Sequence, residues 1–159
     1  MHADDVFRYG HLTILRVVDG FPEECWDVPG ACGAWTPRDI LAHLASYEML
    51  IGDVLSSILS VGPTPTLDRF LTPEIPFNET EVAERAQHSA TALLGEYETA
   101  HRRAADLLAQ IPLQQRREAG ILAWYGVEYD LEDAIAYIGY GHKQEHGAQL
   151  AAARTLSPA

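Results

Sequence analysis

The sequence predicts an all-α protein, a four-helix bundle in up-down-down-up order with a long proline-rich crossover between the second and third helices. Three observations support this fold class. Apolar residues recur at helical spacing in four stretches of the chain. Segments that contain proline and glycine separate these stretches. One of these segments, residues 61–78, is much longer than the usual helix–helix loop of about 2–8 residues.

Length and composition predict a single domain over residues 1–159. A chain of 159 residues, 47% of them hydrophobic, buries roughly two thirds of its unfolded surface on folding. The formal net charge of −12 repels phosphate backbones and anionic lipid headgroups, so we expect neither nucleic acid nor a membrane as partner. The sequence shows no run of 18 apolar residues and no signal peptide, which predicts a cytoplasmic protein.

The first helix is predicted over residues 4–20, where apolar residues recur at helical spacing and glycine and proline follow. His11 lies among these apolar positions, on the same face of the predicted helix. We interpret it as a histidine hydrogen-bonded within the core, with a position beside a metal site as the alternative. Cys25 and Cys32 lie in the following connection without a Cys-x-x-Cys spacing. They are interpreted as free thiols, with a disulfide or redox pair as the minor alternative.

The second helix has a strong start signal. Thr36 suits the N-cap, Pro37 the first helical position, and Asp39 faces the exposed N–H groups of the first turn. The helix is predicted to run to about Ser60, with His43 on its apolar face. Because a lone inward histidine is more often a core residue than a ligand, this placement by itself does not indicate a metal site.

The crossover at residues 61–78 contains four prolines and no periodic apolar pattern. It is long enough to run the length of a bundle, which makes the second and third helices parallel. Two compatible interpretations remain open. The segment is a tether between helices, or it is a lid that carries Phe70 and Phe77 over a pocket.

The third helix is predicted from about residue 78 to residue 111, with an alanine-rich stripe that allows close packing. His88 and His101 lie at the edge of the stripe or off it, and we interpret both as solvated. In the connection that follows, Trp124 and Tyr125 are expected to cover the open end of the core.

The fourth helix is predicted to begin at Asp130 and Asp133. Extending its apolar stripe leads to His142 and His146, which are four residues apart and therefore one turn apart on one face, with Cβ atoms roughly 5–6 Å apart. Two buried imidazoles without a shared cation or other partners are costly to desolvate. This placement favours a metal site.

In the up-down-down-up order the second and fourth helices are antiparallel, and at about 1.5 Å per residue the height of His43 approaches that of His146. His43, His142 and His146 would then form a three-histidine site with a coordination position left for water or substrate, as in catalytic zinc sites. Imidazole ligands also suit other divalent ions. We expect zinc or nickel, with iron or manganese as alternatives.

Three further residues are candidates for holding or lining this site. Glu145 either orients a ligand or is a surface charge. Tyr47, one turn after His43, and Tyr140 either line a pocket or belong to the core. Residues 142–146 also match the H-x-x-E-H pattern of inverted zinc proteases, but such an enzyme needs a ligand well downstream, and too little chain follows.

Two stretches are similar to a known family. Residues 35–48 (WTPRDILAHLASYE) resemble the tryptophan-capped second helix of the DinB/YfiT-like superfamily, and residues 141–150 (GHKQEHGAQL) resemble its last helix. The resemblance implies an up-down-down-up four-helix bundle with a divalent metal held by His43, His142 and His146.

The resemblance also implies a range of functions. Characterised relatives include transferases and isomerases that use small cofactor thiols such as bacillithiol or mycothiol, and suspected metal-dependent hydrolases. The mycothiol-dependent maleylpyruvate isomerase branch typically has a carboxylate where His142 stands here, which disfavours that reaction. Dimers are common in the family.

The leading hypothesis is a metal-dependent enzyme that activates a small-molecule thiol for attack on a small electrophile, a thiol-dependent S-transferase. One alternative is a metal-dependent hydrolase of a small substrate. Another is a non-catalytic metal-containing protein that binds a small ligand under stress. The third is a bundle with an apolar core and no metal.

Overall fold

The computed structural model describes residues 2–156, and every long element in this range is helical. The elements are α1 (Ala3–Val18), η1 (Glu23–Cys25), α2 (Pro37–Leu59), α3 (Pro65–Phe70), α4 (Phe77–Glu84), α5 (Ala90–Gln110), α6 (Leu113–Arg116), α7 (Leu131–Ala134), η2 (Ile135–Gly141) and α8 (His142–Ala153). Within this range the only β-type pairing is an isolated bridge between Cys32 and Trp35. The all-α fold class is therefore confirmed.

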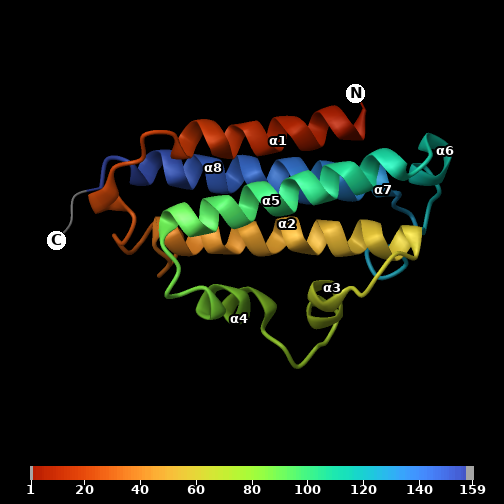
Figure 1. Ribbon diagram of the computed structural model, residues 1–159, viewed down its shortest axis with the longest axis horizontal. Coiled ribbons are helices and arrows are strands. Elements are labelled where there is room, and N and C mark those ends of the chain that lie inside the picture. Colours follow the sequence, from red (N-terminus) through yellow and green to blue (C-terminus); the bar gives the residue numbers. More distant parts are fainter. Residues whose placement is uncertain (1, 157–159) are drawn as a thin grey trace.

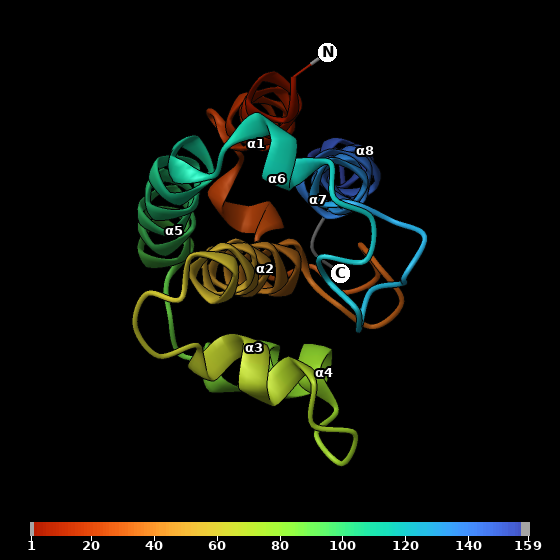
Figure 2. The ribbon, with the colours of Figure 1, turned by 90° about the vertical axis from the view of Figure 1, so that its right-hand side faces the viewer.

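Four long helical segments lie side by side: α1, α2, α5, and a last segment in which α7, η2 and α8 follow one another (Figures 1 and 2). In Figure 1, α2 and α5 run from left to right, whereas α1 and the last segment run from right to left. None of the described helices combines the length and the low polarity that a bilayer-spanning segment needs.

The start of α2 follows the local signal in the sequence. The Thr36 hydroxyl accepts a hydrogen bond from the Asp39 N–H at 3.1 Å, and the Asp39 carboxylate accepts one from the Thr36 N–H at 2.9 Å. Pro37 occupies the first turn, where its missing N–H is not needed. The helix ends at Leu59, with Ser60 as its C-cap, so both predicted ends are confirmed.

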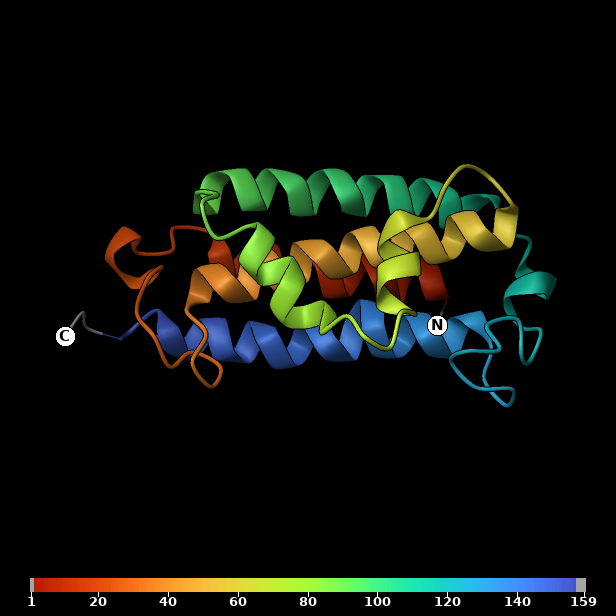
Figure 3. The ribbon, with the colours of Figure 1, turned by 90° about the horizontal axis from the view of Figure 1, so that it is seen from below.

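The crossover contains one short helix, α3, and leads into a second, α4, and both lie along α2 outside the four long segments (Figures 2 and 3). Asp53 of α2 anchors the first of them. Its buried carboxylate accepts hydrogen bonds from the N–H groups of Thr66, at 2.7 Å, and Leu67, at 3.3 Å. The negative charge thus satisfies exposed amides in the first turn of α3.

The prediction of one helix over residues 78–111 is wrong. The chain breaks between α4 and α5, and Ser89 caps α5 anew. Arg85, buried at the break, pairs with Glu81 of α4 at 2.8 Å and with Glu96 of α5 at 2.7 Å. These tertiary ion pairs stabilise a turn that the apolar periodicity does not reveal.

The last segment begins at Asp130, whose side chain accepts from the Asp133 N–H, while the Asp133 side chain accepts from the Asp130 N–H. This reciprocal cap confirms the predicted start. After α7 the backbone widens into the π-helical turns of η2, and the His142 N–H donates to the carbonyl of Tyr137, five residues back. A π-helical segment of this kind frequently lies at a functional site.

The first helix packs unusually close to η2. A Cβ atom on Gly10 would lie 2.0 Å from the carbonyl oxygen of Gly139, so only glycine permits this approach. The contact holds α1 against the segment that leads into α8.

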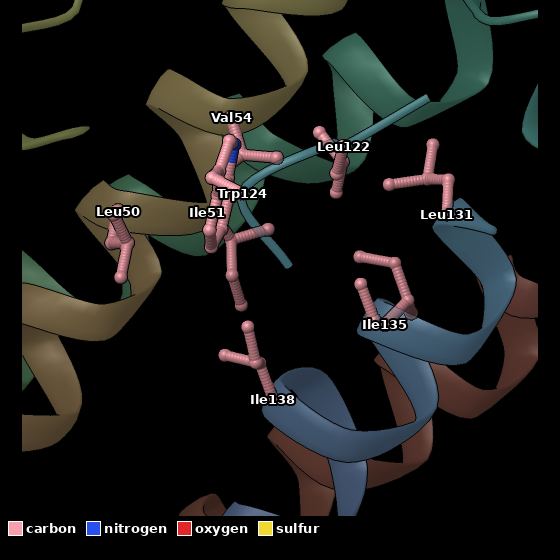
Figure 4. A pocket seen from close by; sticks show the side chains of 9 residues that line it. Leu50, Ile51, Val54, Leu122, Trp124, Leu131, Ile135 and Ile138 are labelled. Atoms are coloured by element: carbon pink, nitrogen blue, oxygen red, sulfur yellow. The ribbon is translucent and has the colours of Figure 1, made fainter. Parts of the chain in front are cut away.

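Residues of the connection after α6 close one end of the core, as expected for Trp124 and Tyr125, which pack against it. Figure 4 shows Leu122 between side chains of α2 and side chains of α7 and η2. Together they enclose a cavity of only about 10 Å³, lined by Leu50, Ile51, Val54, Leu122, Trp124, Leu131, Ala134, Ile135 and Ile138. This end of the bundle is therefore well packed.

Candidate metal centre

The structure brings together His43 of α2 and His142 and His146 of α8, here called the histidine cluster. One nitrogen from each imidazole lies within 4.8 Å of the other two. The Nε2 atoms of His43 and His142 are 2.8 Å apart. His43 and His146 are buried and His142 is half-buried. Two helices that are far apart in the sequence thus aim three nitrogen atoms at one point.

Burial keeps these imidazoles neutral. With smaller contributions from the neighbouring imidazoles, it lowers the pKa of His43 to about 3 and that of His142 to about 4. Burial also lowers the pKa of His146. At neutral pH each ring therefore keeps a lone pair that can bind a metal ion.

The arrangement fits a divalent ion. Nitrogen atoms bound to one tetrahedral zinc at 2.0–2.1 Å lie about 3.3 Å apart, within the range of separations in the cluster. The buried Nδ1 atoms of His43 and His142 have no hydrogen-bond partner among residues 2–156. A proton shared between the two Nε2 atoms would engage His43 and His142 alone, whereas a shared cation would accept a lone pair from all three rings.

Gln149 fixes the orientation of His146. Its side-chain oxygen lies 2.7 Å from Nδ1 of His146. Because an amide oxygen only accepts hydrogen bonds, Nδ1 carries the proton and Nε2 keeps its lone pair. Hydrogen bonds of this kind hold metal-binding histidines in the required tautomer.

Aromatic rings form one wall of the cluster. The ring of Tyr47 lies 4.6 Å from the rings of both His43 and His142, and Trp35 lies 5.0 Å from His43. The Tyr47 hydroxyl donates to the Asn78 side-chain oxygen at 3.1 Å. Tyr47, predicted to line a pocket or belong to the core, thus contacts the cluster and links α2 to α4.

The crossover contributes to this wall. The rings of Phe70 and Phe77 lie 6.4 and 5.8 Å from Tyr47, and Phe70 also lies 5.7 Å from Trp124. Residues 61–78 therefore connect α2 to α4, and two of their aromatic rings pack against the ring of Tyr47.

The other predicted residues lie at different places. Glu145 is exposed, and its carboxylate makes no ion pair within the described residues. Tyr140 is 39% exposed. His11 stacks on His101, with ring centroids 3.7 Å apart, and on Tyr97, 5.0 Å away. None of the three belongs to the histidine cluster.

A second polar cluster was not expected from the sequence. Glu48 of α2 and Lys143 of α8 form a fully buried ion pair, and the second carboxylate oxygen of Glu48 lies 3.2 Å from Nδ1 of His101 on α5. The prediction that His101 is solvated is therefore wrong, whereas His88 is exposed as predicted. We call Glu48, Lys143 and His101 the ion-pair cluster.

Both cysteines are free, as predicted. The buried Cys25 thiol donates to the Leu156 carbonyl at 3.2 Å. Neither Cys25 nor Cys32 belongs to the group of residues around the histidine cluster.

The mycothiol maleylpyruvate isomerase N-terminal domain family matches residues 7–132. The match spans most of the chain, so the protein belongs to this family, a branch of the DinB/YfiT-like superfamily. It includes His43 and ends before His142 and His146. No curated protein and no solved structure gave a significant match.

Proposed function

We propose that the protein is a divalent-metal-dependent transferase that joins a small-molecule thiol to a small electrophile, with His43, His142 and His146 as the metal ligands. The observation that carries the proposal is the convergence of three neutral imidazoles from α2 and α8, two of them buried and that of His142 half-buried. The family membership supports it, because the family takes its name from a mycothiol-linked enzyme.

The ligand set suits this chemistry. A divalent ion held by three neutral ligands keeps its full positive charge, acts as a Lewis acid and lowers the pKa of a bound thiol or water. Gln149 keeps the His146 lone pair available. The aromatic wall at Tyr47 excludes water from one side of the cluster and offers apolar surface to a substrate.

The thiol would come from a cofactor. Cys25 is buried and donates to the backbone near the end of α8, so it does not face the histidine cluster. A low-molecular-weight thiol is therefore the second substrate that we propose.

A metal-dependent hydrolase is the second candidate, favoured by the neutral ligand set, which would activate water as well as a thiol. A non-catalytic protein that binds a small ligand is the third. We further propose a cytoplasmic, single-domain homodimer in which the long segments form an up-down-down-up bundle. Light scattering in solution tests the dimer.

Metal analysis of protein purified without a histidine tag tests the site. We expect stoichiometric zinc or nickel in the parent and loss of the ion in His43→Ala and His142→Ala. His88→Ala, which removes an exposed histidine, is the matched control and should retain the ion. A parent that stays largely metal-free under replete conditions, or ligand variants that keep the ion, would remove the proposal.

A conjugation screen tests the reaction. Glutathione, bacillithiol, mycothiol and simple thiols are combined with chlorinated and epoxide electrophiles, with and without chelator. Metal-dependent consumption that needs a thiol supports the transferase. Consumption with water alone identifies the hydrolase, and saturable binding without turnover identifies the ligand-binding protein.

A further inference from the structure

The ion-pair cluster joins the same two helices as the histidine cluster. Glu48 follows His43 by five residues on α2, which corresponds to a rise of about 7.5 Å and a turn of about 140°. Lys143 follows His142 directly on α8, about 100° around the helix. The ion pair therefore connects α2 to α8 near the height of the histidines, on a different face of each helix.

Both charges are removed from water. Glu48 is 0% exposed and Lys143 is 1% exposed. Burying an ion is unfavourable, and replacing a buried ion pair by apolar residues of similar size is often neutral or stabilising. A stability gain is therefore a poor explanation for the pair. The best-attested use of buried ionic groups in proteins is to select one register of two packed helices over other registers.

All four long segments define the position of the ammonium group. The Lys143 Nζ lies 4.5 Å from the ring centre of Phe7 on α1 and 5.6 Å from that of Tyr97 on α5. His101 of α5 holds the other oxygen of Glu48. A shift of α8 by one residue or one turn would remove the ammonium from its carboxylate and from both rings.

The register of α8 needs such a contact because η2 precedes it. The cap at Asp130 fixes the start of α7, but each π-helical turn holds more residues than an α-helical turn. A return of η2 to α-helix would rotate and shift every residue after Gly141. Lys143 is the first fully buried side chain after η2.

We propose that the buried Glu48–Lys143 pair fixes the register of α8 on α2 and thereby holds His142 beside His43. Both residues are positioning residues, because they act on the site through His142. The inference rests on the proposed function for its metal readout, and a metal-free readout tests it separately.

The test uses the double variant Glu48→Leu/Lys143→Met, in which apolar side chains replace both charges and leave no buried ion unpaired. Circular dichroism establishes that it folds. We expect zinc to bind about 10–100-fold more weakly than in the parent, as for the loss of groups that orient metal ligands. The visible absorption of the cobalt-loaded protein should change as well.

Leu150→Ala is the matched control. Leu150 is a buried residue of α8 without charge, so its loss lowers stability but leaves the ion pair intact. We expect folded Leu150→Ala to keep the zinc affinity and the cobalt spectrum of the parent. A double variant that also keeps the zinc affinity and the cobalt spectrum of the parent would overturn the proposal.

A crystal structure of the metal-free double variant provides the independent readout. We expect η2 to change or α8 to shift, with loss of the contact between His43 and His142. An unchanged η2 and an unchanged contact would overturn the positioning role even if the parent bound no metal. Absence of metal in the parent alone would remove the proposed function and not this inference.

Discussion

The histidine cluster and the ion-pair cluster both join α2 to α8, but they differ in the source of positive charge. The ion-pair cluster contains its own cation, the Lys143 ammonium, placed on the Glu48 carboxylate. The histidine cluster contains three neutral rings whose lone pairs converge. The ion-pair cluster is complete within the chain, whereas the histidine cluster would be completed by the metal ion that we propose. This difference separates a group that fixes how the helices pack from a group that is suited to bind a cation.

The largest effect on the free energy of unfolding should come from removing one charge of the ion-pair cluster. Lys143→Ala leaves the Glu48 carboxylate buried without its partner, and loss of one member of a buried pair costs about 3–5 kcal/mol. Denaturant unfolding of the metal-free protein measures this. Glu145→Ala, which removes an exposed charge two residues away, should change the free energy of unfolding by less than about 0.5 kcal/mol. Equal changes in the free energy of unfolding for Lys143→Ala and Glu145→Ala would contradict the conclusion that the ion-pair cluster fixes how the helices pack.

Loss of Gln149 should weaken metal binding by the histidine cluster without unfolding the protein. In Gln149→Ala, His146 loses the hydrogen bond that sets its tautomer, and we expect metal affinity to fall about 10–100-fold. Competition with a chelating dye measures the affinity. Gln144→Ala is the control, because the Gln144 amide donates to Thr13 on α1 and not to the cluster. An affinity that falls equally in both variants would count against the role of Gln149.

The close contact between α1 and η2 can be tested by adding one methyl group. Gly10→Ala places a Cβ against the Gly139 carbonyl, and we expect a loss of about 1–3 kcal/mol in the free energy of unfolding. Gly95→Ala, in open space on α5, should stabilise the protein by about 0.4–1 kcal/mol. Thermal or denaturant unfolding compares the two. A stabilised Gly10→Ala variant would show that the helices are not held this closely.

The smallest effect concerns pH and the rings beside the ion-pair cluster. Burial, with a smaller contribution from His101, lowers the pKa of His11 to about 3, so the unfolded chain binds the extra proton first as the pH falls. Stability due to His11 is therefore complete above about pH 6.5 and is lost as the pH falls toward about 3.

His11→Phe keeps a ring at this position and removes the proton. Between about pH 4 and 6, its free energy of unfolding should fall less steeply with decreasing pH than in the parent, by at most about 1.4 kcal/mol per pH unit. Because solvent screens the half-buried ring of His11, the difference between the two slopes should be smaller than this limit. Urea unfolding at several pH values measures both slopes, and identical slopes would show that His11 takes up no proton on unfolding.

Local sequence signals predicted the caps and the main helices well. Thr36 and Asp39 start α2, and Asp130 and Asp133 start α7, because each pair satisfies backbone groups within one turn. Apolar periodicity placed His43 on the inner face. The same periodicity failed at Arg85, where ion pairs across α4 and α5 end a helix that the pattern continues.

The candidate site was predicted in part. Spacing put His142 and His146 on one face, the antiparallel order of the second and fourth helices made His43 the candidate third member, and the family resemblance strengthened that prediction. The sequence marked Tyr47 only as a residue of a pocket or of the core and gave no signal for Gln149, because the contacts of both residues depend on side-chain positions in the folded protein.

The sequence by itself determined an all-α chain, its helix caps and the inward faces of three histidines, because these depend on neighbours within a few turns. Only the tertiary structure decided that Glu48, His101 and Lys143 are buried together and that η2 widens before His142. In the sequence these residues look like ordinary surface charges, since nothing local distinguishes a solvated ion from a paired one. Their environment arises only when α1, α2, α5 and α8 close around them.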